Sequence, residues 1–173
     1  MQSLQNLKDT FYATLQSRVA AGNPARTVVI RGTVRPGVLV SENELPGAAL
    51  DGISPPDTFC LRWTDLRVDT HGALPFVTQR CEIRYATDGT TAMGGMDRGR
   101  SLAQMDNELY EAVTLQQQSA PQLVVAEITG GGASTETAAG TNVFWGDVAY
   151  KPAVMRGERM ERTAEVEVFC YGE

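Results

Sequence analysis

Residues 164–171 read Ala-Glu-Val-Glu-Val-Phe-Cys-Tyr, and this strict alternation bears most directly on the fold. A period of two is typical of a half-buried antiparallel strand, with one side facing a core and the other facing water. The segment 81–85, Cys-Glu-Ile-Arg-Tyr, alternates in the same way. We therefore expect two long strands of a mainly antiparallel sheet. The side chains expected to face inward from the terminal strand are Ala164, Val166, Val168 and Cys170.

Shorter apolar or β-branched runs predict the remaining strands, because such residues favour a pleated, half-buried surface. Asp69-Thr70-His71-Gly72 predicts a turn, so its two flanking strands should form a hairpin. Arg35-Pro36-Gly37 indicates another turn, since Pro-Gly pairs interrupt regular structure. The predicted strands are 27–31, 38–40, 59–69, 76–87, 123–129, 143–150 and 165–171.

Two segments have the apolar spacing of three and four that marks an amphipathic helix. The first carries Leu4, Leu7, Phe11, Leu15 and Val19, and Gly22-Asn23-Pro24 ends it. The second follows Gly94-Gly95-Met96-Asp97, with Asp97 or Ser101 available as the N-cap, and presents Leu102, Met105, Leu109 and Val113 on one face. The strands come in runs between the helices rather than alternating with them. We therefore predict an α+β fold in a single domain, 1–173, with both amphipathic helices packed on the sheet.

Two stretches fit neither pattern. Residues 41–57 contain three prolines and two glycines, and residues 130–140 are rich in glycine, alanine and threonine with one charge. Loops of that length are uncommon in a compact domain unless they are functional or disordered. We interpret both as long loops, or arms that become ordered against a neighbour.

Composition excludes several classes of function. The net charge is −6 and only two lysines are present, so the chain lacks the clustered basic residues that grip nucleic acid. No run approaches the roughly 20 apolar residues of a membrane helix, and residues 1–6 do not resemble a secretion signal. Three widely spaced cysteines, an odd number, predict reduced thiols. We expect a protein that is made and assembled in the cytosol.

Candidate catalytic groups are few. The single histidine, His71, lies in a predicted turn, and the cysteines Cys60, Cys81 and Cys170 lack the close spacing of a zinc site. The glycines at 130–132 are not followed by the lysine of a phosphate-binding loop. Gly94-Gly95 precedes a helix whose N-terminus could hold an anion, but two glycines alone are weak evidence for such a site, and a turn is the better explanation. We predict no enzyme, no metal and no cofactor.

Segment 98–100 is Arg-Gly-Arg, and segment 156–162 interleaves arginine with glutamate. Charges of both signs at close spacing fit ion pairs between subunits better than a uniform field does. They also fit an ordinary solvated loop. The candidate subunit-interface residues are Arg98, Arg100, Arg156, Glu158, Arg159, Glu161 and Arg162.

The order of these elements resembles that of the tail terminator, or tail-completion, proteins of tailed bacteriophages. The resemblance rests on the N-terminal helix at 4–19, the strand, loop and helix unit from 81–85 to 97–106, and the final segments 145–150 and 162–168. It covers most of the chain. The long insertion at 41–57 and the glycine tract at 130–140 depart from the family.

The resemblance implies a structural virion protein that forms a homo-oligomeric ring, commonly a hexamer. Such a ring caps the tail tube and joins the tail to the head, so the implied partners are the tail tube protein and the head–tail connector. DNA would pass through the lumen without specific binding, and an acidic chain is compatible with that role. The implied location is the neck of the virion, after assembly in the host cytoplasm.

Two alternatives remain open. The chain could be another neck, connector or tube-associated subunit, because small α+β ring formers share these features. It could also be a small-ligand-binding domain in which Trp63, Trp145 and Tyr85 line a pocket, although aromatic residues at such positions are more often part of a core.

Overall fold

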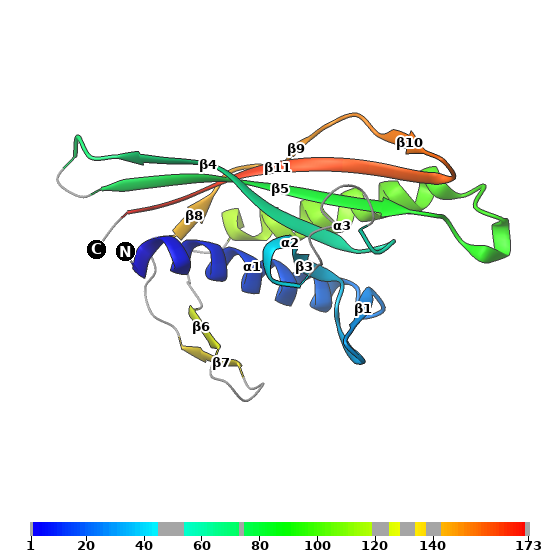
Figure 1. Cartoon of the computed structure of the whole chain (residues 1–173), viewed down its shortest axis with the longest axis horizontal. Coiled ribbons are helices and arrows are strands. Elements are labelled where there is room, and N and C mark those ends of the chain that lie inside the picture. Colours follow the sequence, from blue (N-terminus) through cyan, green and yellow to red (C-terminus); the bar gives the residue numbers. More distant parts are fainter. Residues whose placement is uncertain are drawn as a thin grey trace.

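The structure is a computed structural model that describes residues 2–44, 54–72, 75–118, 125–128, 134–137 and 143–171. Two long helices, α1 (Gln2–Gly22) and α3 (Arg98–Gln118), lie beneath a curled and mainly antiparallel sheet (Figure 1). This arrangement confirms the predicted α+β class. The helices begin and end close to the predicted positions, and α1 stops one residue before the predicted Asn23-Pro24 break.

The sheet is built on three long strands. β4 (Phe59–Asp69), β5 (Phe76–Thr87) and β11 (Arg159–Tyr171) run antiparallel to one another, with β5 in the middle. The predicted hairpin of β4 and β5 is confirmed. β3 (Val38–Val40) lies parallel to β4 at one edge. At the opposite edge β11 pairs in succession with three short strands, β8 (Val143–Trp145), β9 (Ala149–Tyr150) and β10 (Val154–Arg156).

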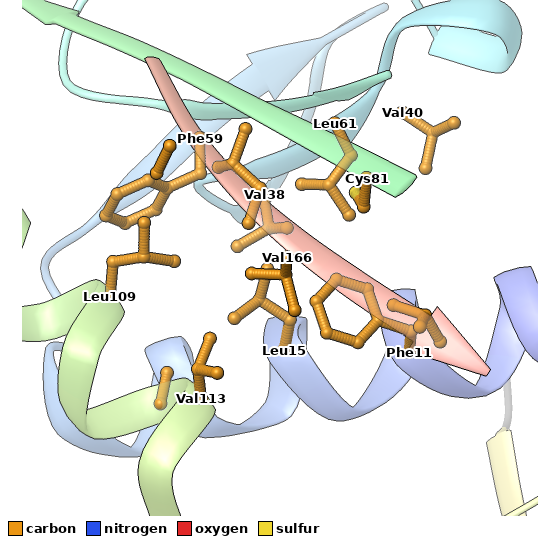
Figure 2. Close-up of a cluster of buried hydrophobic side chains, with 14 of the residues drawn as sticks. Phe11, Leu15, Val38, Val40, Phe59, Leu61, Cys81, Leu109, Val113 and Val166 are labelled. Carbon is orange, nitrogen blue, oxygen red and sulfur yellow. The ribbon is translucent and has the colours of Figure 1, made fainter. Parts of the chain in front are cut away.

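The core lies between the helices and the inner face of the sheet. Its side chains come from both helices and from β3, β4, β5 and β11 (Figure 2). The predicted stripes of both helices are buried, apart from Leu4, which is partly buried against the cluster. The inward-facing residues predicted for β11 are also buried. Each fully buried Leu, Ile or Phe contributes about 1.5–3 kcal/mol relative to an exposed one, so this cluster holds the two layers together.

A buried ion pair connects the start of the sheet region to α3. Arg26 pairs with Glu108, and their side chains are only 8% and 13% exposed. Arg26 also donates to the backbone oxygen of Asp57 at 2.8 Å, and Asn23 donates to Glu108 at 2.8 Å. Burial acts to raise the pKa of Glu108, but hydrogen bonds from Arg26 and Asn23 outweigh it and leave the pKa below its usual value.

β1 (Thr27–Ile30) and β2 (Thr33–Pro36) form a separate hairpin beyond the end of α1 (Figure 1). The chain reverses at Arg31 and Gly32, whose φ angles are +50° and +79°. Two adjacent residues with positive φ are typical of the tight turns that join hairpin strands. The turn predicted at 35–37 is therefore wrong for Arg35 and Pro36, because the reversal falls four residues earlier and both lie in β2.

The single strand predicted at 143–150 is also wrong. Residues 146–148 interrupt it and divide it into β8 and β9, although Gly146 still donates to the backbone oxygen of Glu167 at 2.9 Å. Gly146 and Asp147 are both poor strand formers, which explains the break.

Each stretch predicted as a long loop contains some regular structure. Residues 41–44 form a short helix, α2 (Ser41–Glu44), and residues 54–57 are irregular. Within 130–140, β7 (Ser134–Thr137) pairs antiparallel with β6 (Val125–Ile128), so the prediction of a loop is wrong for those four residues. The remaining residues of both stretches, 45–53, 130–133 and 138–140, lie outside the described part of the chain.

Candidate assembly interface

A pocket of about 490 Å³ opens at one end of the sheet. It lies between the loop that follows β5, the start of α3 and the turn between β10 and β11. We call it the arginine pocket because arginines from two of these elements line it. Its lining residues are Asp88, Gly89, Thr90, Thr91, Gly94, Gly95, Arg98, Arg156, Glu158 and Arg159.

Arg159 closes one wall of the pocket. Its guanidinium donates to both carboxylate oxygens of Asp88, at 2.8 and 3.0 Å, and to the backbone oxygen of Ser54 at 2.9 Å. The hydrogen bond from Arg159 lowers the pKa of Asp88, and the same contact raises the pKa of Arg159. This bidentate pair joins the β11 strand to the loop after β5 with a fixed geometry.

The loop from Gly89 to Gly95 brings the backbone close to Arg98. Gly89 and Gly95 have φ angles of +74° and +78°, which L side chains rarely adopt. A Cβ on Gly95 would lie 2.6 Å from Nη2 of Arg98 and 2.9 Å from the backbone oxygen of Asp88. Gly95 is therefore required for the guanidinium of Arg98 to pack on the loop. Nε of Arg98 is buried and has no hydrogen-bond partner among the described residues.

Asp97 holds this loop to the helix. It immediately precedes α3, as predicted for an N-cap, and the backbone N–H of Ser101 donates to its carbonyl oxygen at 2.9 Å. Its carboxylate accepts hydrogen bonds from the backbone N–H and the hydroxyl of Thr90, at 2.9 and 2.8 Å. These two bonds lower the pKa of Asp97. The short helical turn η2 (Thr91–Met93) lies between Thr90 and Asp97 in the chain.

The structure brings four of the seven predicted interface residues into one site. Arg98, Arg156, Glu158 and Arg159 line the arginine pocket. Glu161 adjoins it, because its carboxylate forms an ion pair with Nε of Arg156 at 2.9 Å. Arg100 is exposed and does not line the pocket.

Arg162 belongs to a different cluster, at the edge where α3 meets β9. Its Nε lies 3.0 Å from a carboxylate oxygen of Asp106, which also accepts a hydrogen bond from the hydroxyl of Tyr85. The hydroxyl of Tyr150 donates to the backbone oxygen of Asp106 at 2.8 Å. Burial first, and Asp106 second, raise the pKa of Tyr85 above its ordinary value and that of Tyr150 to about 12.

Sequence reasoning did not identify this second cluster. Asp106 lies four residues after Leu102 on α3, at the border of the apolar stripe. A carboxylate at that border faces a neighbouring element at close range, so its partner must be basic or a hydrogen-bond donor. The spacing from Leu102 was the available signal that Asp106 has a partner. No local pattern in the sequence identifies Tyr85 or Tyr150 as that partner.

Exposed apolar side chains lie in two of the segments that line the arginine pocket. Met93 and Met96 lie in its loop, and Met96 is 85% exposed. Val154 and Met155 of β10 are also exposed, and they are neighbours in sequence, so they point to opposite faces of the strand. β10 therefore extends beyond the cover of the helices. Flexible methionines next to arginines are common at protein contact surfaces.

The other candidate catalytic or metal-binding side chains do not come together in one site among the described residues. In the ranges that the structure describes, no three His, Cys, Asp or Glu residues are grouped so that they could hold a metal ion. His71 is exposed and pairs with Asp69 at 2.7 Å. All three cysteines are buried. No described helix is long and apolar enough to cross a membrane.

The chain was also compared with known proteins. No protein-family model matches it, and no curated protein sequence is significantly similar to it.

Proposed function

We propose that this chain is a structural protein that assembles with copies of itself, as the tail terminator ring of a tailed bacteriophage. The observation that carries the proposal is the arginine pocket. It gathers four of the residues that the sequence marked for subunit contact, and the segments that line it also carry exposed methionines and valine.

The residue types in and near the arginine pocket suit contact with another protein. An interface combines arginine, methionine and aromatic side chains with apolar area that is poorly covered in the monomer. Met96, Val154 and Met155 supply the exposed apolar area, and Arg98 and Arg156 supply donors. The bidentate pair of Arg159 and Asp88 holds the surface in one conformation, which lowers the entropy lost on association.

In this proposal six copies form a ring that ends the tail tube. The ring contacts the tail tube protein on one side and the head–tail connector on the other, within the neck of the virion. DNA passes through the lumen without specific binding, because a net charge of −6 per subunit does not attract phosphates. Another neck, connector or tube-associated subunit would use the same kind of contact and differ in its partner.

The pocket also supports a second candidate, a small-ligand-binding domain. The ligand would be anionic, because arginines line the pocket. The aromatic residues considered from the sequence do not form this site. Tyr85 and Trp63 are buried in the core, and Trp145 packs against it. A screen of carboxylates and phosphates for a thermal shift that disappears in Arg98→Ala would favour this candidate.

Native mass tests the main proposal. Light scattering on a sizing column, with negative-stain images, should give rings, and six copies of an 18.7 kDa chain have a mass of about 112 kDa. If the free chain is monomeric, it should form rings on purified tail tubes and stop their growth. Arg98→Ala with Arg156→Ala should weaken assembly, whereas the control Arg67→Ala, at an exposed site on β4, should not. A chain that is monomeric alone and leaves tubes uncapped would overturn the proposal.

A further inference from the structure

The lining of the arginine pocket is polar throughout. Its described lining residues are glycines, threonines, arginines and acidic residues, and no aromatic or aliphatic side chain is among them. The volume of about 490 Å³ lies within the usual range of small-ligand sites, about 300–1,000 Å³. Most such sites have mainly apolar walls. A pocket of this size with polar walls therefore suits a hydrophilic ligand.

Two of the three arginines keep hydrogen-bond donors that no described residue uses. Arg98 forms no hydrogen bond or ion pair within the described part of the chain, and its Nε is buried. Arg156 pairs with Glu161 through Nε, and none of the described residues accepts a hydrogen bond from its Nη groups. In contrast, Arg159 is held by both carboxylate oxygens of Asp88. The donors available to a ligand are therefore those of Arg98 and Arg156.

The loop after β5 fixes the position of the Arg98 side chain. A Cβ on Gly95 would lie 2.7 Å from Cζ of Arg98, so the guanidinium packs directly on the backbone of the loop. A Cβ on Gly89 would lie 3.1 Å from Cγ of the same side chain. The side chain thus contacts the loop at both glycines before any ligand arrives. A donor held in this way loses little conformational entropy when it binds.

The charges of the pocket determine which ligands it accepts. Two of its arginines are already paired with carboxylates, which leaves Arg98 and Glu158 as the charges without an ion pair among the described lining residues. A site without an excess of positive charge does not concentrate anions by its field. It selects them by the direction of its donors, because a guanidinium binds an oxyanion through parallel N–H groups. A second anionic group on the ligand would be repelled by Glu158, whereas a hydroxyl group would donate to it.

We propose that the arginine pocket binds a small hydroxylated molecule that carries one oxyanion, such as a sugar phosphate or a sugar acid. Arg98 and Arg156 donate to the oxyanion, and Glu158 accepts hydrogen bonds from the hydroxyl groups. Phosphate and carboxylate present the same kind of acceptor to a guanidinium, so the ligand is defined by the oxyanion that they share. This inference rests on the second candidate function, which it makes more specific, and it does not depend on ring formation.

Isothermal titration calorimetry with four probes tests the class of ligand. Glucose 6-phosphate and gluconate carry both an oxyanion and hydroxyl groups, inorganic phosphate carries the anion alone, and glucose carries hydroxyl groups alone. Titrations in about 0.15 M sodium chloride screen general ionic attraction. We expect glucose 6-phosphate, gluconate or both to bind at least tenfold more tightly than inorganic phosphate, and glucose not to bind. Which of the two binds more tightly would show whether the oxyanion is a phosphate or a carboxylate.

Single substitutions locate the site. Arg98→Gln and Arg156→Gln should each raise at least tenfold the dissociation constant of the probe that binds the wild type, because each removes charged donors. Glu158→Gln should reduce the preference for that probe over inorganic phosphate. The control Arg67→Gln, at an exposed site on β4, should bind as the wild type does. The side chain of Arg156 is 63% exposed, so its substitution tests the site even if Arg98→Gln does not fold.

The outcomes separate this inference from the proposed functions. If no probe binds the wild type at concentrations up to about 10 mM, the inference is wrong, whether or not the chain forms rings. If a probe binds wild type, Arg98→Gln and Arg156→Gln equally, the ligand occupies another site. That result would overturn the inference and leave a small-ligand-binding function standing. Inorganic phosphate that binds as tightly as the hydroxylated probes would also overturn it, because the pocket would then recognise the anion alone.

Discussion

Replacing Arg26 with alanine should destabilise the protein more than any surface substitution. The side chain is 8% exposed and joins three parts of the fold. It pairs with Glu108 on α3, donates to the backbone of Asp57 before β4, and places its guanidinium 5.6 Å from the ring centre of Phe59. The substitution therefore leaves the carboxylate of Glu108 largely buried without its charged partner.

The contacts of Glu108 determine how much stability the Arg26→Ala substitution should remove. Breaking a buried pair by removing one partner costs about 3–5 kcal/mol, because the remaining charge keeps its desolvation penalty. Asn23 and Gln104 still donate to Glu108, at 2.8 and 3.2 Å, which places the expected loss near the lower limit. For a chain of this length, about 3 kcal/mol lowers Tm by roughly 6–12 °C. Replacing both partners at once, Arg26→Met with Glu108→Leu, should cost much less than Arg26→Ala.

Urea denaturation followed by circular dichroism would measure these differences at one fixed protein concentration, since assembly adds to apparent stability. The four free energies of unfolding from wild type, Arg26→Ala, Glu108→Ala and the double alanine variant form a cycle. We expect a coupling energy above about 1.5 kcal/mol. Additive effects, or a loss below about 1 kcal/mol for Arg26→Ala, would refute the reasoning from burial.

The same pair predicts a dependence on pH. The pKa of Glu108 is lower in the folded protein than in the unfolded chain, where a glutamate titrates near about 4.3. Its contribution to stability is therefore present above that unfolded value and is lost as the pH falls through the folded pKa. The difference in stability between wild type and Glu108→Gln should be largest at neutral pH and should shrink below about pH 4.

Three further outcomes follow from the described contacts. Gly95→Ala should lower the free energy of unfolding by about 2 kcal/mol or more, whereas Gly94→Ala should lower it by about 1 kcal/mol. Both glycines have positive φ, but only Gly95 lacks space for a Cβ. Equal denaturation midpoints for the two variants would contradict the contact of Gly95 with Arg98. Tyr85→Phe should cost about 1.5–3 kcal/mol, since its hydroxyl donates to the carboxylate of Asp106, and a neutral effect would show that the bond adds no stability. The folded protein should not react with a thiol reagent until it unfolds, because its thiols are buried and burial raises the pKa of two of them. Fast reaction of the folded protein would place a thiol at the surface. The three thiols are Cys60, Cys81 and Cys170.

Periodicity in the sequence was sufficient to predict the two layers of the fold. The alternation at 164–170 and the helical spacing of Leu102 and Leu109 reflect burial on one face, and burial depends on local pattern. The break at 146–148 did have a local signal, because Gly146 and Asp147 are poor strand formers, and the prediction of a single strand overlooked it. The β2 strand was missed because its boundary had no such signal. Arg31 is an unusual residue for the first position of a tight turn, so the reversal carried no local signal, and Pro-Gly at 36–37 suggested a turn where the chain only changes direction.

The candidate site was predicted in part. The arginines of 98–100 and the mixed charges of 156–162 indicated contact residues, but they did not indicate that Arg98 and Arg159 meet across one pocket. That meeting depends on β5 and β11 pairing along their full length, which brings Asp88 to Arg159. The pairing of distant strands is a property of the whole chain rather than of any segment. The cluster around Asp106 was missed because its members come from four separate elements.

The places where this chain departs from local preference coincide with its uncovered surfaces. In the core, pattern, packing and burial agree, as they do when a sequence specifies one structure. At the β1–β2 hairpin they disagree, because Arg31 adopts a conformation that suits glycine and a pair of valines faces water. Neither feature stabilises a monomer. Arg31→Gly should therefore stabilise the isolated chain by up to about 1 kcal/mol in urea denaturation, and an unchanged or lower free energy of unfolding would show that the turn is not strained.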